Sequence, residues 1–251
     1  MTENMTLSAN ADDPRLNAIL AALPEADFDR ILPDLELVPL PTKWTMMESG
    51  DLVPYLYFPI SGVVSLNYAL EDGFSSEVAL VGNEGMVGIS VFMGGKSMPT
   101  STEVQNPGKA YKLSRNVMKR EFALGGKLQE YSLLYTQALF CQSCQTAVCN
   151  QHHLLEQQLC RWLLMSMDRL HSNDIFITQE MIANLLGVRR ETVTQAIGQL
   201  QKDGLICATR GHVQVLDRPG IEDRVCECYD AVKKQYQRLL PPVPGTSRKL
   251  S

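Results

Sequence analysis

The sequence predicts an α+β fold in three parts: an antiparallel β barrel or sandwich, a long helix, and a C-terminal group of short helices with a hairpin. Between residues 35 and 113, short apolar or alternating runs are interrupted by Gly, Pro, Asn and Asp, which is typical of many short strands. Residues 127–170 contain no Gly or Pro, and short helical patterns return after Thr178. A chain of 251 residues is long enough for two domains, and we expect the divisions 14–126, 127–171 and 172–240.

Short helices and then strands fill the first part. Leu16, Ile19 and Leu20 share one helical face, and Pro24 opens a second short helix. The segment EDG, residues 71–73, indicates a hairpin turn between two strand patterns. The clearest strand patterns are YLYFPI (55–60), GVVSLNYAL (62–70), SEVALV (76–81) and GKAYKL (108–113).

The stretch from Lys127 to Leu170 indicates one long helix, with room for a break. A helix of about 40 residues would be about 60 Å long, more than one small domain can cover. A partner chain is the simplest place to bury its apolar stripe, so this segment predicts a homodimer. The stripe that we expect to be shared is Leu128, Tyr131, Tyr135, Ala138 and Phe140, continued by Leu155, Leu159 and Trp162 or Leu163.

A pair of short helices joined by a glycine turn follows residue 177. Thr178 is a good N-cap, and Gly187 ends the first helix because glycine adopts the left-handed conformation at little cost. The second helix starts near Arg189 and packs through Val193, Ile197 and Leu200. Its opposite face is polar in the first two turns, the part of a DNA-reading helix that reaches base edges.

These polar residue types match the hydrogen-bonding groups of bases. Arginine can donate two parallel bonds to guanine, glutamate can accept from the cytosine amino group, and glutamine can pair with adenine. The base-reading residues that we predict are Arg190, Glu191 and Gln195.

A small hairpin follows the second helix, which ends at Asp203-Gly204, and it carries Arg210-Gly211 at its tip. Helix, glycine turn, polar-faced helix and basic-tipped hairpin, in that order, predict a winged helix-turn-helix that binds double-stranded DNA. Contacts to phosphate fix the position of such a domain without reading sequence. We predict them from Thr178, Arg189, Thr192 and Arg210.

The charge distribution is compatible with this assignment. The net charge is −5, but residues 1–150 hold 10 Lys+Arg against 17 Asp+Glu, a balance of −7, and residues 151–251 hold 13 against 11, a balance of +2. The C-terminal part alone is therefore suited to approach phosphates.

At these motifs the chain resembles the Crp–Fnr family of transcription regulators. The segment GVRRETVTQAIGQLQKDGLI (187–206) is similar to the recognition-helix signature of the family, in which Arg-Glu-Thr-Val is typical. SGVVSLNYALEDG and LVGNEGMVGISVFMGG resemble the family's cyclic-nucleotide-binding-like jelly roll, the β-roll, and the long helix resembles its dimerisation helix. The resemblance implies a β-roll sensor domain, a homodimer on a near-palindromic operator with half-sites about 10 bp apart, and RNA polymerase as a partner.

Two departures from the family pattern matter. Members often carry a second arginine one turn after the glutamate, where this chain has Gln195. Members that bind cyclic AMP hold it with Gly-Glu and Arg-Ser pairs, whereas the matching positions here are Gly85-Met86 and Thr100-Ser101. Without an arginine for the phosphate, the sequence argues against cyclic AMP. We expect an effector pocket at these four residues, with no cofactor predicted and the effector unknown, or else a simple turn shaped by Gly82, Glu84, Gly85 and Gly88.

Seven cysteines in a chain without a secretory signal suggest reduced thiols. Cys141, Cys144 and Cys149 form a C-x2-C-x4-C pattern, followed by His152 and His153. Three readings stay open: an iron–sulfur, zinc or haem site, a thiol redox switch, and packing in a dimer seam. Cys226 and Cys228 fall in one predicted helix from Ile221 to Leu239, where side chains two residues apart diverge, so no metal site is predicted.

Other function classes are less well supported. No nucleophile elbow, zinc-protease motif or phosphate-binding glycine loop occurs, so we expect no enzyme. A polar N-terminus and the lack of a long apolar run lead us to expect a cytoplasmic protein that does not span a membrane. Two alternatives remain: a cysteine-based redox or metal sensor, and a small-molecule sensor whose C-terminal domain binds protein.

Overall fold

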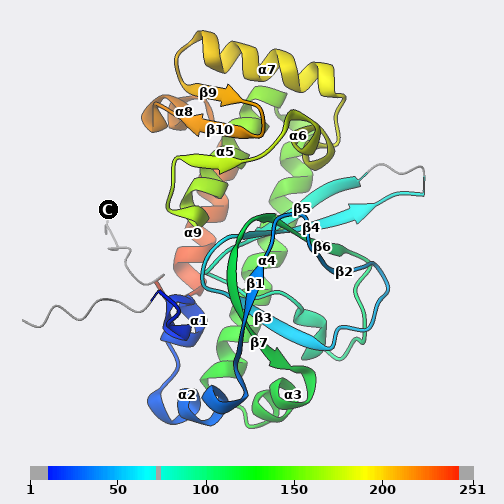
Figure 1. Cartoon of the computed structure of the whole chain (residues 1–251), viewed down its shortest axis with the longest axis vertical. Helices are drawn as coiled ribbons and strands as arrows, with labels where there is room; N and C mark the ends of the chain where they lie inside the picture. Colours follow the sequence, from blue (N-terminus) through cyan, green and yellow to red (C-terminus); the bar gives the residue numbers. More distant parts are fainter. Residues whose placement is uncertain (1–10, 72–74, 243–251) are drawn as a thin grey trace, which may run out of the picture.

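The structure is a computed structural model that describes residues 11–71 and 75–242. It has a β-roll in the middle, a long helix along its length, and a small helical domain at one end (Figure 1). The strands are β1 Glu36–Leu40, β2 Thr45–Met47, β3 Tyr55–Pro59, β4 Val63–Ala69, β5 Ser75–Val81, β6 Ser101–Asn106, β7 Gly108–Ser114, β8 Asp174–Phe176, β9 Ile206–Thr209 and β10 His212–Val215. The α-helices are α1 Ala18–Ala21, α2 Glu25–Ile31, α3 Arg115–Ala123, α4 Lys127–His152, α5 Leu155–Leu170, α6 Gln179–Leu186, α7 Arg190–Lys202, α8 Arg218–Arg224 and α9 Cys228–Leu239.

Two antiparallel sheets form the β-roll and confirm the predicted fold class. Their strand orders are β1-β7-β3 and β2-β6-β4-β5. The sheets enclose an apolar core into which α1, α2 and α4 also pack, with Phe58, Leu113 and Met118 fully buried. Strands β4 and β5 pair from Val64↔Val81 to Ala69↔Ser75, as a hairpin requires. Most of the predicted turn at 71–73 lies outside the described residues.

The predicted long helix is two helices, α4 and α5, which meet at a break. His153 and Leu154 are extended, and the Gln157 side chain accepts a hydrogen bond from the Leu154 backbone N–H at 3.1 Å. The Gln158 side-chain amide donates to three carbonyls around the break, the shortest being that of His153 at 2.8 Å. These bonds satisfy backbone groups that the break exposes, so the chain turns without Gly or Pro.

Helix α5 folds back along α4 instead of extending it. Arg161 donates to Thr146 Oγ1 at 3.2 Å, and Arg169 donates to Gln142 Oε1 at 2.9 Å, so later residues of α5 contact earlier residues of α4. Leu159, Trp162 and Leu163 of α5 belong to the core of the C-terminal domain. The expectation that the α5 side chains continue a stripe facing a partner chain is therefore wrong.

Helix α4 buries within its own chain most of the face that was predicted to be shared with a partner, leaving only Phe140 of that stripe exposed. Leu128, Tyr135 and Ala138 lie in the core of the same chain. Helix α4 approaches the β-roll closely at Gly85, where an added Cβ would lie 2.3 Å from the Tyr135 ring. Because α4 is apolar on more than one side, the sequence alone does not identify its inner face.

The C-terminal domain has a three-stranded antiparallel sheet of order β8-β10-β9, against which α5, α6, α7 and α8 pack. Strand β8 is a three-residue element that the sequence analysis missed. The predicted terminal helix is two helices, because Asp217 caps α8 and the chain then breaks at 225–227 before α9. Helix α9 returns alongside α4 (Figure 1).

A buried polar network joins the β-roll to both helices. The Arg169 Nε atom lies 2.8 Å from Glu84 Oε1, and both side chains are largely buried. Gln142 Oε1 accepts from Arg169 and from the Tyr236 hydroxyl, each at 2.9 Å. Gln142 Nε2 donates to the Leu80 carbonyl at 3.2 Å. These contacts tie together a β-roll turn, α4, α5 and α9.

No helix within the described parts of the chain combines the length and apolarity needed to cross a membrane.

Candidate DNA-binding site

Helices α6 and α7 form the helix-turn-helix that the sequence predicted. Thr178 Oγ1 accepts from the Met181 backbone N–H at 3.1 Å, which caps the start of α6. Gly187 has a φ of 65°, the left-handed conformation that ends α6. Val193, Ile197 and Leu200 of α7 are buried in the domain core, which fixes the direction in which the other face of α7 points.

That other face of α7 is exposed. Figure 1 places α7 at the outer end of the molecule, away from α2 and α3. The side chains of Arg189, Arg190, Glu191, Thr192 and Gln195 are all exposed, and none makes a hydrogen bond or ion pair with another described side chain. Two guanidinium groups, a carboxylate and an amide are thus left available to an external partner at the N-terminal half of one helix.

The start of α7 is positioned by a contact with α6. Thr194 Oγ1 donates to Gln179 Oε1 at 2.8 Å and to the Arg190 carbonyl at 3.0 Å. The Gln179–Thr194 contact was not predicted. A polar residue at the first position of α6, facing a threonine one turn into α7, is the pattern that could have indicated it.

The wing is formed by β9 and β10, with Arg210 exposed at the tip and Gly211 at a φ of 87°. Phe176 of β8 packs edge-on against His212 of β10, which supports the base of the hairpin. Thr178, the remaining predicted phosphate contact, is half-buried. Its oxygen caps α6 as an acceptor, so the hydroxyl proton can still be donated.

The helix-turn-helix contacts the β-roll of the same chain through α6. Ser76 Oγ of β5 donates to the Leu185 carbonyl at 3.4 Å, and Asn106 Nδ2 donates to the Phe176 carbonyl at 3.5 Å. Strand β5 and helix α6 are therefore in direct contact, while α7 remains free.

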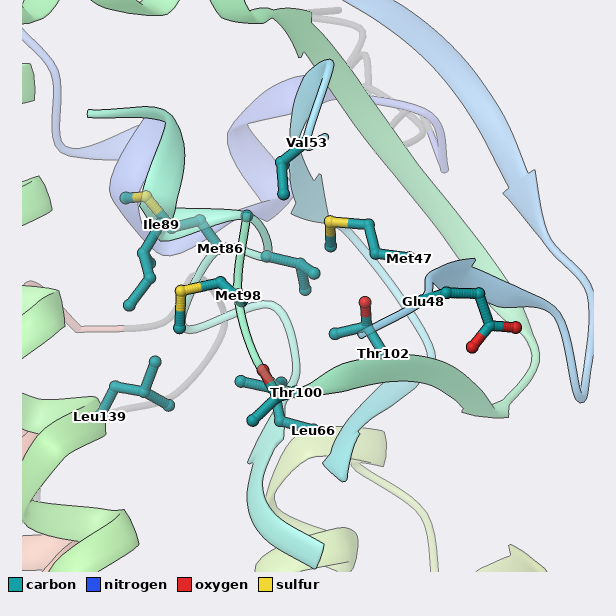
Figure 2. A pocket seen from close by; sticks show the side chains of 12 residues that line it. Met47, Glu48, Val53, Leu66, Met86, Ile89, Met98, Thr100, Thr102 and Leu139 are labelled. Atoms are coloured by element: carbon teal, nitrogen blue, oxygen red, sulfur yellow. The ribbon is translucent and has the colours of Figure 1, made fainter. Parts of the chain in front are cut away.

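The predicted effector residues are only partly brought together. Met86 and Thr100 line one pocket of the β-roll, whereas Gly85 packs against Tyr135 and Ser101 pairs with Asn67 in the sheet. Figure 2 shows the pocket, which is lined mostly by methionine and aliphatic side chains, with Glu48, Thr100 and Thr102 as its polar members and Leu139 of α4 on one side. Neither Arg nor Lys is among its described lining residues, which fits the argument against a cyclic nucleotide phosphate.

The C-x2-C-x4-C pattern does not form one site. Cys149 is buried, Cys141 is half-buried and Cys144 is exposed. Cys149 instead lies 3.6 Å, Sγ to Sγ, from Cys226, which is distant in the sequence. The expectation that Cys226 and Cys228 diverge on one helix is wrong, because α8 ends before them and both are buried beside Cys149.

Comparisons with known proteins match this geometry. The family model for the Crp-like helix-turn-helix domain matches residues 157–224, which include most of α5 with the helix-turn-helix and wing. The comparison with curated protein sequences finds no match.

Solved structures resemble about three quarters or more of the chain. A Crp/Fnr-family protein from Eubacterium rectale is 18% identical, with a TM-score of 0.66, covering 83% of this chain and 98% of that chain. FixK2 from Bradyrhizobium japonicum is 14% identical, with a TM-score of 0.63, covering 76% and 98%. The c-di-GMP-responsive global regulator CLP from Xanthomonas campestris is 18% identical, with a TM-score of 0.62, covering 77% and 100%.

Sequence identities this low establish a shared fold and nothing further. The family model identifies residues 157–224, which include the exposed face of α7, as a Crp-like helix-turn-helix domain. Taken together, residues 157–224 form a Crp-like helix-turn-helix domain, and the chain has the fold of solved Crp/Fnr-family structures.

Proposed function

We propose that the protein is a homodimer that reads a near-palindromic operator, with one α7 helix in each half-site. The observation that carries this proposal is the exposed polar start of α7, where Arg190, Glu191 and Gln195 have no partner among the described residues. Side chains of these types at that place on a recognition helix are suited to base edges. Arg189, Thr192, Thr178 and Arg210 surround them and are proposed to contact phosphates.

Two neighbouring arginines allow base reading to be separated from phosphate binding. A selection from random DNA defines the preferred site, and affinity is then measured on that site and on a scrambled site. We expect Arg190→Ala to weaken binding to the preferred site roughly ten- to hundredfold, with little change on the scrambled site. We expect Arg189→Ala to weaken binding to both DNAs, and to reduce by about one the slope of log affinity against log salt concentration.

The proposal fails if both variants weaken both DNAs equally, because α7 would then bind only phosphate. Lys202→Ala, at the far end of α7, is the control for a general loss of positive charge.

The dimer is proposed on the exposed face of α4. Phe140 is 68% exposed and Leu133 is 52% exposed, although both are large apolar side chains. Exposed residues recur along this face at alternating spacings of four and three, the repeat of a coiled-coil seam. They are Leu133, Gln137, Phe140, Cys144, Ala147 and Gln151.

Replacing the central aromatic residue of this seam tests the dimer. We expect Phe140→Glu to weaken self-association roughly tenfold or more, because a buried aromatic anchor is exchanged for two facing charges. Sedimentation over a concentration series measures the effect. Leu52→Glu is the matched control, since Leu52 is 60% exposed and lies outside α4. Equal association of the two variants would show that the seam lies elsewhere.

The effector and the protein partner remain parts of this proposal. The β-roll pocket includes Leu139, the neighbour of Phe140 on α4, so a ligand there would contact the helix that carries the seam. A mostly apolar pocket in which Glu48 is the one charged side chain among the described lining residues is poorly suited to the anionic phosphate of a cyclic nucleotide. By its resemblance to the family, we propose that RNA polymerase is the protein partner, and that the chain is not an enzyme and acts in the cytoplasm.

A further inference from the structure

Four potential metal ligands come together where the α4–α5 break meets the α8–α9 break. Cys149 lies in the last turn of α4, and His153 is the first residue after that helix. Cys226 and Cys228 come from the chain between α8 and the start of α9. The three thiols form a buried cluster of their own, separate from the two apolar cores.

Two of the distances between these side chains match those of a tetrahedral site. The Sγ atoms of Cys149 and Cys226 are 3.6 Å apart, and Cys228 Sγ lies 3.4 Å from His153 Nδ1. All four ligand atoms lie within 4.8 Å of one another. Zinc bonded tetrahedrally to sulfur and imidazole nitrogen places two sulfurs about 3.8 Å apart and a sulfur and a nitrogen about 3.6 Å apart.

We propose that Cys149, His153, Cys226 and Cys228 bind one Zn²⁺ ion as a Cys3His site that ties the α4–α5 hinge to the C-terminal helices. Four protein ligands leave no open position for water, so the site is structural rather than catalytic.

The surroundings of the four ligands fit this assignment. His153 Nδ1 faces the thiols while its Nε2 lies 3.4 Å from Glu227 Oε2, an arrangement in which a carboxylate orients a metal-binding imidazole. Gln145 Nε2 lies 3.0 Å from Cys228 Sγ and donates toward it, as an N–H group does toward a metal-bound thiolate. Zinc with three thiolates carries a net charge of about −1. The buried guanidinium of Arg161, bonded to Thr146 one turn before Cys149, supplies nearby positive charge.

A disulfide bond between two of these cysteines accounts for fewer of the observed contacts than a zinc ion does. A bond between Cys149 and Cys226 would use two of the four groups and leave Cys228 and His153 facing each other without a role. A bound metal gives a role both to the histidine beside Glu227 and to the thiol that Gln145 faces.

The site has a mechanical consequence. Its ligands come from α4, from the hinge after it and from the segment before α9, so one ion would fix three segments in one arrangement. Helix α4 carries the proposed dimer seam, and α5 belongs to the DNA-reading domain. Zinc would therefore hold the angle between these two parts of the molecule.

The direct test is metal content of the full-length chain, purified under reducing conditions from zinc-supplemented cells. We expect about one zinc per chain in the wild type and in Cys160→Ala, which removes a buried thiol outside the ligand set. We expect less than about a tenth as much in Cys226→Ser and Cys228→Ser, since a lost thiolate strongly weakens a structural site. His153→Ala should retain less than the wild type.

Cobalt provides a second measurement that needs no variant to fold. Titration of the metal-free wild type with Co²⁺ should give the intense visible bands of tetrahedral cobalt–thiolate coordination, with saturation at one equivalent and displacement by Zn²⁺. Limited proteolysis near residue 153 should be slower in the zinc-loaded protein than after chelation.

Three results would overturn the site: a reduced wild type that contains no zinc and gives no cobalt bands, equal metal loss in Cys160→Ala, or a Cys149–Cys226 disulfide in protein prepared without oxygen. None of these measurements involves DNA. Failure of the proposed operator binding would therefore leave the metal result standing, and the reverse also holds.

Discussion

Replacing Glu84 with alanine is expected to lower the free energy of unfolding by about 3–5 kcal/mol, the usual cost of removing one partner of a buried ion pair. The cost arises because Arg169 would keep its charge inside the protein, where its side chain is only 8% exposed. Its hydrogen bonds to Gln142 and to the Met165 carbonyl would remain, but neither supplies a negative charge. Urea unfolding at neutral pH measures the loss.

Two further variants separate this explanation from a general packing effect. Glu84→Leu combined with Arg169→Met should recover most of the stability, because apolar replacement of a whole buried pair is often close to neutral. Glu25→Ala breaks the exposed Arg15–Glu25 pair and should cost far less. If Glu84→Ala costs no more than Glu25→Ala, Glu84 does not neutralise Arg169.

Glu77 is expected to make stability depend on pH in a direction unusual for a carboxyl group. Burial in the contact between β5 and α5 raises the pKa of Glu77 to about 7, against an ordinary value of 4.5, although Ser65 and Arg161 oppose the shift. Between these two values the folded protein holds more protons than the unfolded chain. The contribution of Glu77 to the free energy of unfolding therefore falls as the pH rises from about 4.5 to about 7, and it is constant above that.

The isosteric variant Glu77→Gln should remove this dependence. At pH 8 it should be more stable than the wild type by up to about 3 kcal/mol, since it carries no charge to bury. Ser65 Oγ, which donates to Glu77 Oε2 at 2.8 Å, can still donate to the glutamine oxygen. At pH 4 the two proteins should be alike.

Denaturant midpoints measured every half unit of pH provide the test for Glu77. Glu103→Gln, on strand β6 of the same sheet and only half-buried, is the matched control. A Glu77→Gln protein that tracks the wild type at every pH would contradict burial of a charged carboxylate at this position.

The DNA-reading domain was predictable because its local sequence determines its local structure. Thr178 caps α6 and Gly187 ends it, and both act through their own backbone conformation. The apolar spacing of Val193, Ile197 and Leu200 then fixes which side of α7 faces outward.

The positions of the two helix breaks were not predictable, because contacts distant in the sequence stabilise them. No glycine or proline marks the turn after His153, which depends on the Gln158 side chain bonding three carbonyls. The turn before α9 places Cys226 beside Cys149 from another part of the chain. A sequence pattern within one segment does not show that Cys149 and Cys226 are neighbours in space. In the sequence analysis the four proposed zinc ligands were therefore divided between two separate predicted helices.

The Gln142 amide has a consequence for how a signal could travel along α4. Its oxygen accepts two hydrogen bonds and its nitrogen donates one, so neither a flipped amide nor a helix turned by one residue could keep all three partners. Turning α4 would also drive the Tyr135 ring out of the space left by Gly85. The hydrogen bonds of Gln142 therefore resist rotation of α4 about its own axis. An effector that acts by rotating α4 must first break the hydrogen bonds of Gln142. An effector that acts by tilting the C-terminal domain can leave these bonds intact.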